Sequence, residues 1–157
     1  MSSLLPRRAT SRRRLMQGAG ALALSAVLPK VAAQVAPAAI PAVAAFLAGR
    51  SPRWERLRLE LPALADNGQA VPMQLSMPGP FAPGPTVQAI HLFSEVNPVP
   101  DMAVFEFPLP PDKVEIDTRI RLAGSQRVAA VAVMSDGALY AAVAEVVVTL
   151  AACLDGS

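Results

Sequence analysis

The stretch that decides the fold is VEIDTRIRL, residues 114–122. Four apolar residues and Thr118 occupy its even-numbered positions, from Val114 to Leu122, while charged residues occupy the odd-numbered positions between them. Strict alternation over nine residues is typical of a β-strand with one face on a core and the other in water. The sequence therefore predicts a half-buried strand here, and the search for its neighbours starts from it.

Two nearly continuous apolar runs follow, residues 127–134 and 139–150, with Ser135-Asp136-Gly137 between them. An Asp-Gly pair between two β-type segments is a strong hairpin signal, because glycine adopts the positive φ that the turn requires. Further strand-like segments precede them, at residues 56–61, 71–75, 87–93 and 102–107. Pro72 in the second of these predicts an edge position or a bulge. About seven strands with turn residues between them predict an all-β fold, an immunoglobulin-like antiparallel sandwich.

The N-terminal third has a different character. Residues 40–47 predict a short helix, with Pro41 in its first turn and Gly49 past its end, and residues 50–53 read as a linker. Before it, an arginine pair precedes an apolar run at 18–28 that is too short to span a bilayer, and small residues follow at 31–33. We expect a twin-arginine-type export signal over residues 1–33, cleaved after Ala33, and a periplasmic protein. An uncleaved membrane anchor is the alternative.

Charge supports a division at this point. The chain has 14 Lys and Arg against 12 Asp and Glu. Six of the basic residues and none of the acidic ones precede the expected cut, so residues 34–157 carry a net charge of −4. The excess of positive charge belongs to the leader, and nucleic acid is not an expected partner. The arginines at 50, 53, 56 and 58 form the one basic cluster, which we interpret as a solvated face.

The residues that could carry chemistry are few. The chain has one histidine, His91, and one cysteine, Cys153. No metal site built from His and Cys is possible with that set, and a strand histidine such as His91 is usually structural. A Cys153–His91 couple is conceivable, although nothing in the spacing supports it. We expect no catalytic residue, no cofactor and no metal, and therefore not an enzyme but a substrate carrier on which separate enzymes act.

Cys153 is unusual because of its position. It lies three residues past the last apolar run, in a segment that reads AACLDGS at 151–157. An odd cysteine in an exported protein indicates an intermolecular disulfide or a free thiol with a function. An extended tail would hold the sulfur about 10 Å beyond the sandwich. Its thiol should need activation by a partner, since Asp155 and the terminal carboxylate disfavour the thiolate.

Several strings resemble the SoxY family, the sulfur-carrying subunit of the bacterial periplasmic thiosulfate-oxidising system. They are LELPALADNGQAVP at 59–72, IHLFSEVNP at 90–98, TRIRLA at 118–123, MSDG at 134–137 and the strand and tail at 146–153. The resemblance implies an immunoglobulin-like sandwich at 54–150, after a helix and linker at 34–53, and a cysteine-bearing tail at 151–157. It implies a heterodimer with SoxZ and covalent sulfur intermediates on Cys153. A haem enzyme would join thiosulfate to the cysteine, and a hydrolase would remove the sulfone group as sulfate.

The tail departs from the family pattern. The family arm is Gly-Gly-Cys-Gly-Gly, whereas here Ala151, Ala152 and Leu154 surround the cysteine and add side-chain bulk. The alternative function is therefore a binding or adaptor sandwich that pairs with a SoxZ-like subunit, its cysteine vestigial or in an intersubunit disulfide. The long apolar runs at 127–134 and 139–150 predict an interface in either case, because an apolar sheet face open to water usually marks one.

Overall fold

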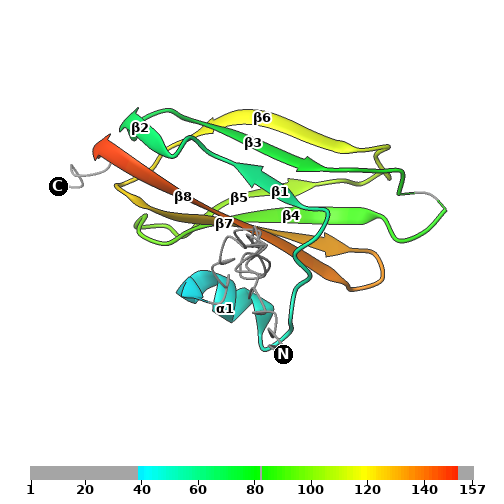
Figure 1. Ribbon diagram of the computed structural model, residues 1–157. Helices are drawn as coiled ribbons and strands as arrows, with labels where there is room; N and C mark the ends of the chain where they lie inside the picture. The colour runs from blue at the N-terminus through cyan, green and yellow to red at the C-terminus, as the bar shows by residue number, and fades with distance from the viewer. Residues whose placement is uncertain (1–38, 82, 152–157) are drawn as a thin grey trace, which may run out of the picture. The chain divides into compact units, whose positions relative to one another are not determined.

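The computed structural model describes residues 39–81 and 83–151. The expected leader and Cys153 lie outside this range. Within these two ranges one helix and eight strands are formed (Figure 1), and their bounds are α1 Pro41–Leu47, β1 Arg58–Glu60, β2 Leu64–Asn67, β3 Val71–Met77, β4 Val87–Ser94, β5 Asp101–Glu106, β6 Val114–Ile120, β7 Gln126–Met134 and β8 Leu139–Leu150. The predicted helix at 40–47 and the all-β sandwich are confirmed.

The strands form two facing sheets (Figure 1). The smaller has the order β1-β3-β6 and is antiparallel throughout. The larger has the order β2-β8-β7-β4-β5, in which β2 runs parallel to β8 and the other pairs are antiparallel. Side chains that alternate along the strands fill the space between the sheets, and Val71, Met73 and Leu75 of β3 are all 1% exposed or less. Burial of this apolar layer is what holds the two sheets together.

The hairpin predicted between the two apolar runs is present. Gly137 has a φ of +82°, its N–H donates to Met134 O at 2.9 Å, and Met134 N–H donates to Ala138 O at 3.0 Å. The Asp136 carboxylate accepts the Ala138 N–H at 3.0 Å. Glycine is needed at position 137 because a Cβ disfavours this left-handed backbone.

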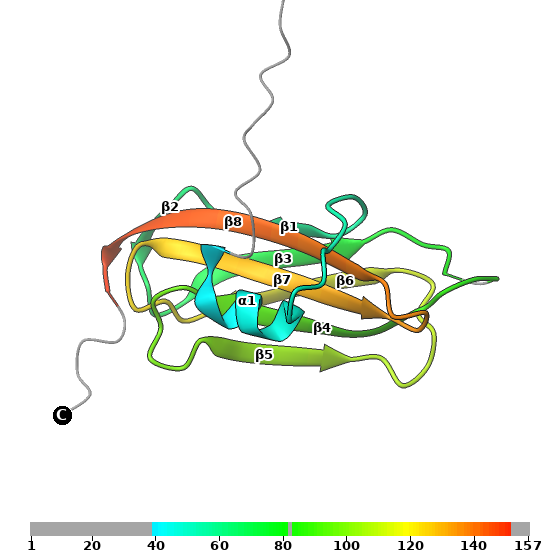
Figure 2. The same ribbon diagram turned by 90° about the horizontal axis from the view of Figure 1, so that it is seen from below.

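Helix α1 covers the outer face of the larger sheet (Figure 2). Val43 and Leu47 of the helix are 0% and 3% exposed and pack with Ala129 and Val131 of β7, among others. Strand β7 is apolar on both faces because one face meets the core and the other meets this helix. The sequence-based argument for an interface is thus wrong for β7: its outward residues need no partner chain, since α1 already covers them.

Two further details differ from the sequence-based expectation. Eight strands form instead of about seven, because Leu64–Asn67 is a strand although Asp66-Asn67-Gly68 reads as a turn. Pro72 lies in the middle strand of its sheet, with no bulge in its pairing to β6. The pairing of β3 with β1 ends at Gln74, however, so the missing N–H of Pro72 removes no bond to β1.

Candidate functional site: the end of the sandwich from which the tail leaves

The predicted site residue, Cys153, is three residues beyond the end of β8, so the site is built around the last residues of that strand. β8 pairs with β7 only as far as Val146, and its continuation pairs with β2 alone, Leu64 beside Val147. Leu150 is 66% exposed and Ala151 is exposed. The last residues of β8 therefore project past β7 at one end of the sandwich.

Backbone hydrogen bonds hold this projecting end. Gly68 N–H donates to Leu150 O at 2.8 Å, and Gly68 O accepts the Leu122 N–H at 2.8 Å. No β7 residue pairs with β8 beyond Val146, and a side chain takes over instead: the Ser125 hydroxyl oxygen accepts the Val148 N–H at 2.9 Å. The start of the tail is thus tied to the β2–β3 turn and to the β6–β7 loop.

A network of side-chain amides ties the adjacent loops together. The Gln126 side chain is 5% exposed. Its Oε1 accepts the Val96 N–H at 3.0 Å, and its Nε2 donates to Asn97 Oδ1 at 2.9 Å and to Gly124 O at 3.2 Å. Asn97 in turn donates to Arg121 O at 2.9 Å and accepts the Ala123 N–H at 2.9 Å. The sequence analysis did not predict this network, although an amide at the start of an apolar run indicates a buried polar group.

An ion pair lies beside the network. The Arg127 guanidinium donates to both carboxylate oxygens of Glu95, through Nη2 to Oε1 and through Nε to Oε2 at 2.9 Å. Arg127 holds the pKa of Glu95 well below its ordinary 4.5, at about 2. The pair is about three-quarters shielded from solvent, with side-chain exposures of 22% and 27%.

Two exposed apolar side chains lie near the end of β8. Leu64 is 58% exposed and Val147 is 49% exposed, and these two residues are register partners on β2 and β8. We call this pair the exit patch; Leu150, three residues after Val147, lies on the other face of the strand. Helix α1 packs on Leu139 and Ala141 near the other end of β8 and does not cover these residues.

His91 belongs to a different part of the molecule. Its ring lies 4.4 Å from the Phe46 ring of α1, between centroids, and desolvation lowers its pKa below 6.5. His91 of β4 pairs with Val131 of β7, and Val131 pairs with Ala141 of β8. Leu150 lies nine residues beyond Ala141 along β8, which places it about 30 Å from the position of His91. Three extended residues span only about 10 Å. A Cys153–His91 couple is therefore excluded while β8 is formed, and His91 packs against Phe46 instead.

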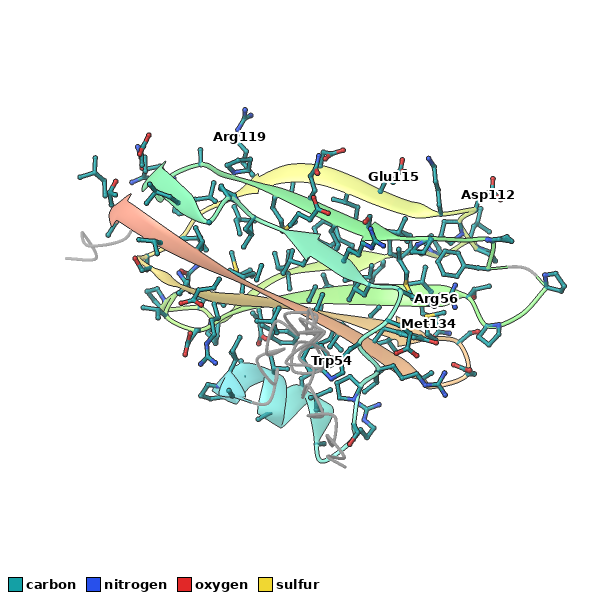
Figure 3. All side chains as sticks on the ribbon, viewed as in Figure 1. Trp54, Arg56, Asp112, Glu115, Arg119 and Met134 are labelled. Carbon is teal, nitrogen blue, oxygen red and sulfur yellow. The ribbon has the colours of Figure 1, made fainter. Side chains whose placement is uncertain are left out.

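The basic cluster of the linker is only in part the solvated face expected. Arg53 donates to Tyr140 Oη at 3.2 Å and lies 5.8 Å from the Tyr140 ring centroid. Arg56, labelled in Figure 3, lies 5.3 Å from the Phe81 ring and adopts a positive φ of 76°. Both guanidinium groups pack on aromatic rings and so hold residues 53–56 against the sandwich, whereas Arg58 remains exposed.

Two other kinds of feature, a metal site and a membrane-spanning helix, concern the rest of the described residues. Among the described residues no three His, Cys, Asp or Glu side chains come together in a way that suits a metal ion. No helix in the described ranges is long and apolar enough to cross a membrane.

The fold and this end of it define a class: an immunoglobulin-like β-sandwich whose long last strand projects at one end and continues into the cysteine-bearing segment. The family model "Sulfur oxidation protein SoxY" matches residues 43–153, so the chain belongs to the SoxY family. The resemblance recognised in the sequence is confirmed.

A solved structure agrees with this assignment. The sulfur carrier protein SoxY from Chlorobium limicola f thiosulfatophilum is 31% identical, with a TM-score of 0.55 over 70% of this chain and 94% of that one. Superoxide reductases are more distant: that of Ignicoccus hospitalis is 18% identical with a TM-score of 0.47 over 60% and 80% of the two chains. That of Nanoarchaeum equitans is 15% identical, with a TM-score of 0.47 over 61% and 100%. No curated protein sequence matches significantly.

Proposed function

We propose that this chain is a sulfur carrier of a thiosulfate- or sulfur-oxidising system, with Cys153 as the attachment point. Membership of the SoxY family and the likeness to a protein described as a sulfur carrier support the class of function. The observation that carries the proposal for this chain is the projecting end of β8. Leu150 is 66% exposed, and the cysteine follows three residues later.

The chemical role of such a tail is delivery. A thiol about 10 Å beyond a rigid sandwich reaches into the narrow active site of another protein, which a cysteine on a sheet face does not. A cysteine with an ordinary pKa near 8.5 is only a few per cent thiolate at neutral pH. The enzymes that load and unload it therefore supply the activation. In this role the chain needs no catalytic group of its own.

Those enzymes are a haem thiosulfate oxidase and a sulfate-releasing hydrolase, and the chain pairs with a SoxZ-like subunit. The exit patch of Leu64 and Val147 supports an interface near the end of β8, because exposed apolar surface often marks one. The compartment is the periplasm, reached by the twin-arginine route after removal of residues 1–33.

One preparation tests the proposal: protein purified from the periplasmic fraction of cells grown on a reduced sulfur compound. Intact mass should show a chain that begins near Gln34 and carries sulfur adducts, and peptide mapping should place them on Cys153. Cys153→Ser should abolish the adducts and change the free energy of unfolding by no more than about 0.5 kcal/mol, as for a surface substitution.

The contrary results are equally definite. A thiol that labels freely in the folded protein but never carries adducts, with loading restored by a Gly-Gly-Cys-Gly-Gly tail, would establish the adaptor function instead. A full-length membrane-bound protein would overturn the proposed compartment.

A further inference from the structure

Strand β5 is the last strand of the larger sheet, and its outer edge is open. It pairs with β4 alone, and Figure 2 shows it at the margin of the sheet, beyond α1. Phe107 N–H donates to Gln88 O at 2.9 Å, and because hydrogen-bonded pairs alternate along an antiparallel ladder, the backbone groups of Phe105 also point to β4. The N–H and C=O groups of Val104 and Glu106 therefore point away from the sheet, where no described strand pairs with them.

This free edge carries exposed apolar surface. Seven large apolar side chains are exposed in the described residues, and four of them belong to β5 and the loops on either side of it, with exposures between 51% and 78%: Val96, Val99, Val104 and Leu109. Natural proteins often protect an open edge with proline or lysine. β5 contains neither, since Pro100 and Pro108 lie just outside its bounds. The edge is therefore suited to contact with another chain.

A groove lies beside this edge, between β5 and β6, the edge strand of the other sheet. Its volume is about 440 Å³. Ala103 and Phe105 line it from β5, and although their register partners on β4 are buried in the core, both side chains are only half-buried. Thr118 lines it from β6 and is exposed, although its register partner on β3 is buried in the core. The two sheets are thus not closed on this side, and the side chains of an added strand can enter between them.

The charge of this segment indicates what kind of strand would bind. Residues 95–112 include four acidic residues and no Lys, Arg or His. Asp101, Val104 and Glu106 share the outer face of β5, because they are register partners of the outward residues of β4. Neither of the two carboxylates forms an ion pair with a described residue. Arg119, across the groove on β6, points away from the sandwich (Figure 3). Basic side chains on a partner strand would therefore complement this edge.

A second copy of this chain fits the edge less well. Two β5 strands paired antiparallel about Val104 would bring Glu106 of each copy close to Asp101 of the other. Like charges opposed across a strand pair are destabilising. A strand with Lys or Arg at those two places and apolar residues between them is attracted instead.

We propose that the free edge of β5 binds an extended, basic segment of a partner protein as an added antiparallel strand. The main chain of that segment bonds to Val104 and Glu106, its apolar side chains enter the groove, and its Lys or Arg side chains lie beside Asp101 and Glu106. This inference does not rest on the carrier function. Its surface is also separate from the exit patch, because β2 and β5 are the two opposite edges of the larger sheet.

A synthetic peptide tests the edge directly. The capped peptide TKLVLKT has the required pattern, with its lysines and valine on one face and its leucines on the other. We expect saturable NMR shifts in isotope-labelled protein at peptide concentrations up to about 1 mM. Hydrogen exchange of the Val104 and Glu106 amides should slow on binding, whereas the Phe105 and Phe107 amides, which already bond to β4, should not change.

Two pairs of peptides serve as controls. The acidic peptide TELVLET should not bind, because its carboxylates meet Asp101 and Glu106. N-methylation of the central valine removes the N–H that faces β5 and should abolish binding, whereas N-methylation of a leucine, whose N–H faces away from β5, should not. Equal binding of the two methylated peptides, or no saturable change up to about 1 mM, would overturn the proposal.

Variants of the protein provide the second measurement. Val104→Pro removes an N–H that does not bond to β4, a place where an edge strand tolerates proline, and should weaken peptide binding at least about tenfold. Val104→Thr, which keeps the N–H, is the matched control. If Val104→Pro disturbs folding, Asp101→Lys with Glu106→Lys decides the question, since that variant should prefer TELVLET, and an unchanged preference refutes the proposal. A dimer that forms without peptide and is lost in Val104→Pro would assign the edge to a second copy instead. None of these results bears on the adducts at Cys153, which decide the carrier function separately.

Discussion

Replacing Gln126 by methionine tests how the loops beside the tail are held. The two side chains are similar in size, but methionine makes none of the three hydrogen bonds of the Gln126 amide. Those bonds join the β4–β5 loop at Val96 and Asn97 to the β6–β7 loop at Gly124. The substitution therefore removes the link between these loops while it keeps the volume of the buried side chain.

The expected cost follows from the burial of the amide. Each hydrogen bond contributes about 0.5–1.5 kcal/mol net, and a shielded donor left without a partner costs about 1–3 kcal/mol. Asn97 Oδ1 keeps the Ala123 N–H, Gly124 is partly exposed and Val96 is 53% exposed, so water can reach the groups left behind and the cost comes mainly from the three lost hydrogen bonds. We expect the free energy of unfolding to fall by about 2–3 kcal/mol.

Urea denaturation of the mature protein measures this difference. Gln74→Met is the matched control, because Gln74 is an exposed residue of β3 whose side chain makes no hydrogen bond with the described residues, and it should change stability by less than about 0.5 kcal/mol. Amide hydrogen exchange should accelerate at Val96 and Ala123 in Gln126→Met. If Gln126→Met is as stable as its control, the network does not hold these loops and the argument fails.

Three further predictions concern the ion pair, the histidine and the helix. Because Arg127 lowers the folded-state pKa of Glu95 from 4.5 to about 2, the stability from this pair is present above pH 4.5 and lost as pH falls toward 2. Glu95→Gln should therefore flatten the pH dependence of unfolding in that window, and an unchanged slope would contradict the pairing. Phe46→Ala should raise the pKa of His91 toward 6.5 in an NMR titration, since the ring helps to exclude water, whereas no change would point to another cause of desolvation. Leu47→Ala should lower stability by about 2–4 kcal/mol, because Leu47 is 3% exposed under the sheet, and a loss below 1 kcal/mol would mean that α1 is not firmly packed.

Local patterns predicted the elements well because each depends on nearby residues. The alternation at 114–122 became β6 and its continuation, with Val114, Ile120 and Leu122 buried. Asp136-Gly137 became the β7–β8 turn, and Pro41 and Gly49 marked the ends of a real helix. In each case a backbone or side-chain preference acts over a few residues, so the sequence carries the signal directly.

The features that the sequence did not predict depend on residues that are far apart in the chain. β2 was missed because a strand of four residues has no pattern of its own, and it forms only where the end of β8 offers it a parallel partner. The linker arginines were read as solvated because their aromatic partners Phe81 and Tyr140 are far away in sequence.

By itself, then, the sequence determined the fold class, the family resemblance and the position of a single cysteine just past the last strand. Only the tertiary structure decided that α1 covers β7, which removes one reason to expect a partner there. It also decided that Gly68 joins the backbone of Leu150 to that of Leu122, and so ties the end of β8 to the loop after β6. The physical reason is that periodicity reports which face of an element is buried, whereas the identity of what covers that face depends on chain segments brought together by folding.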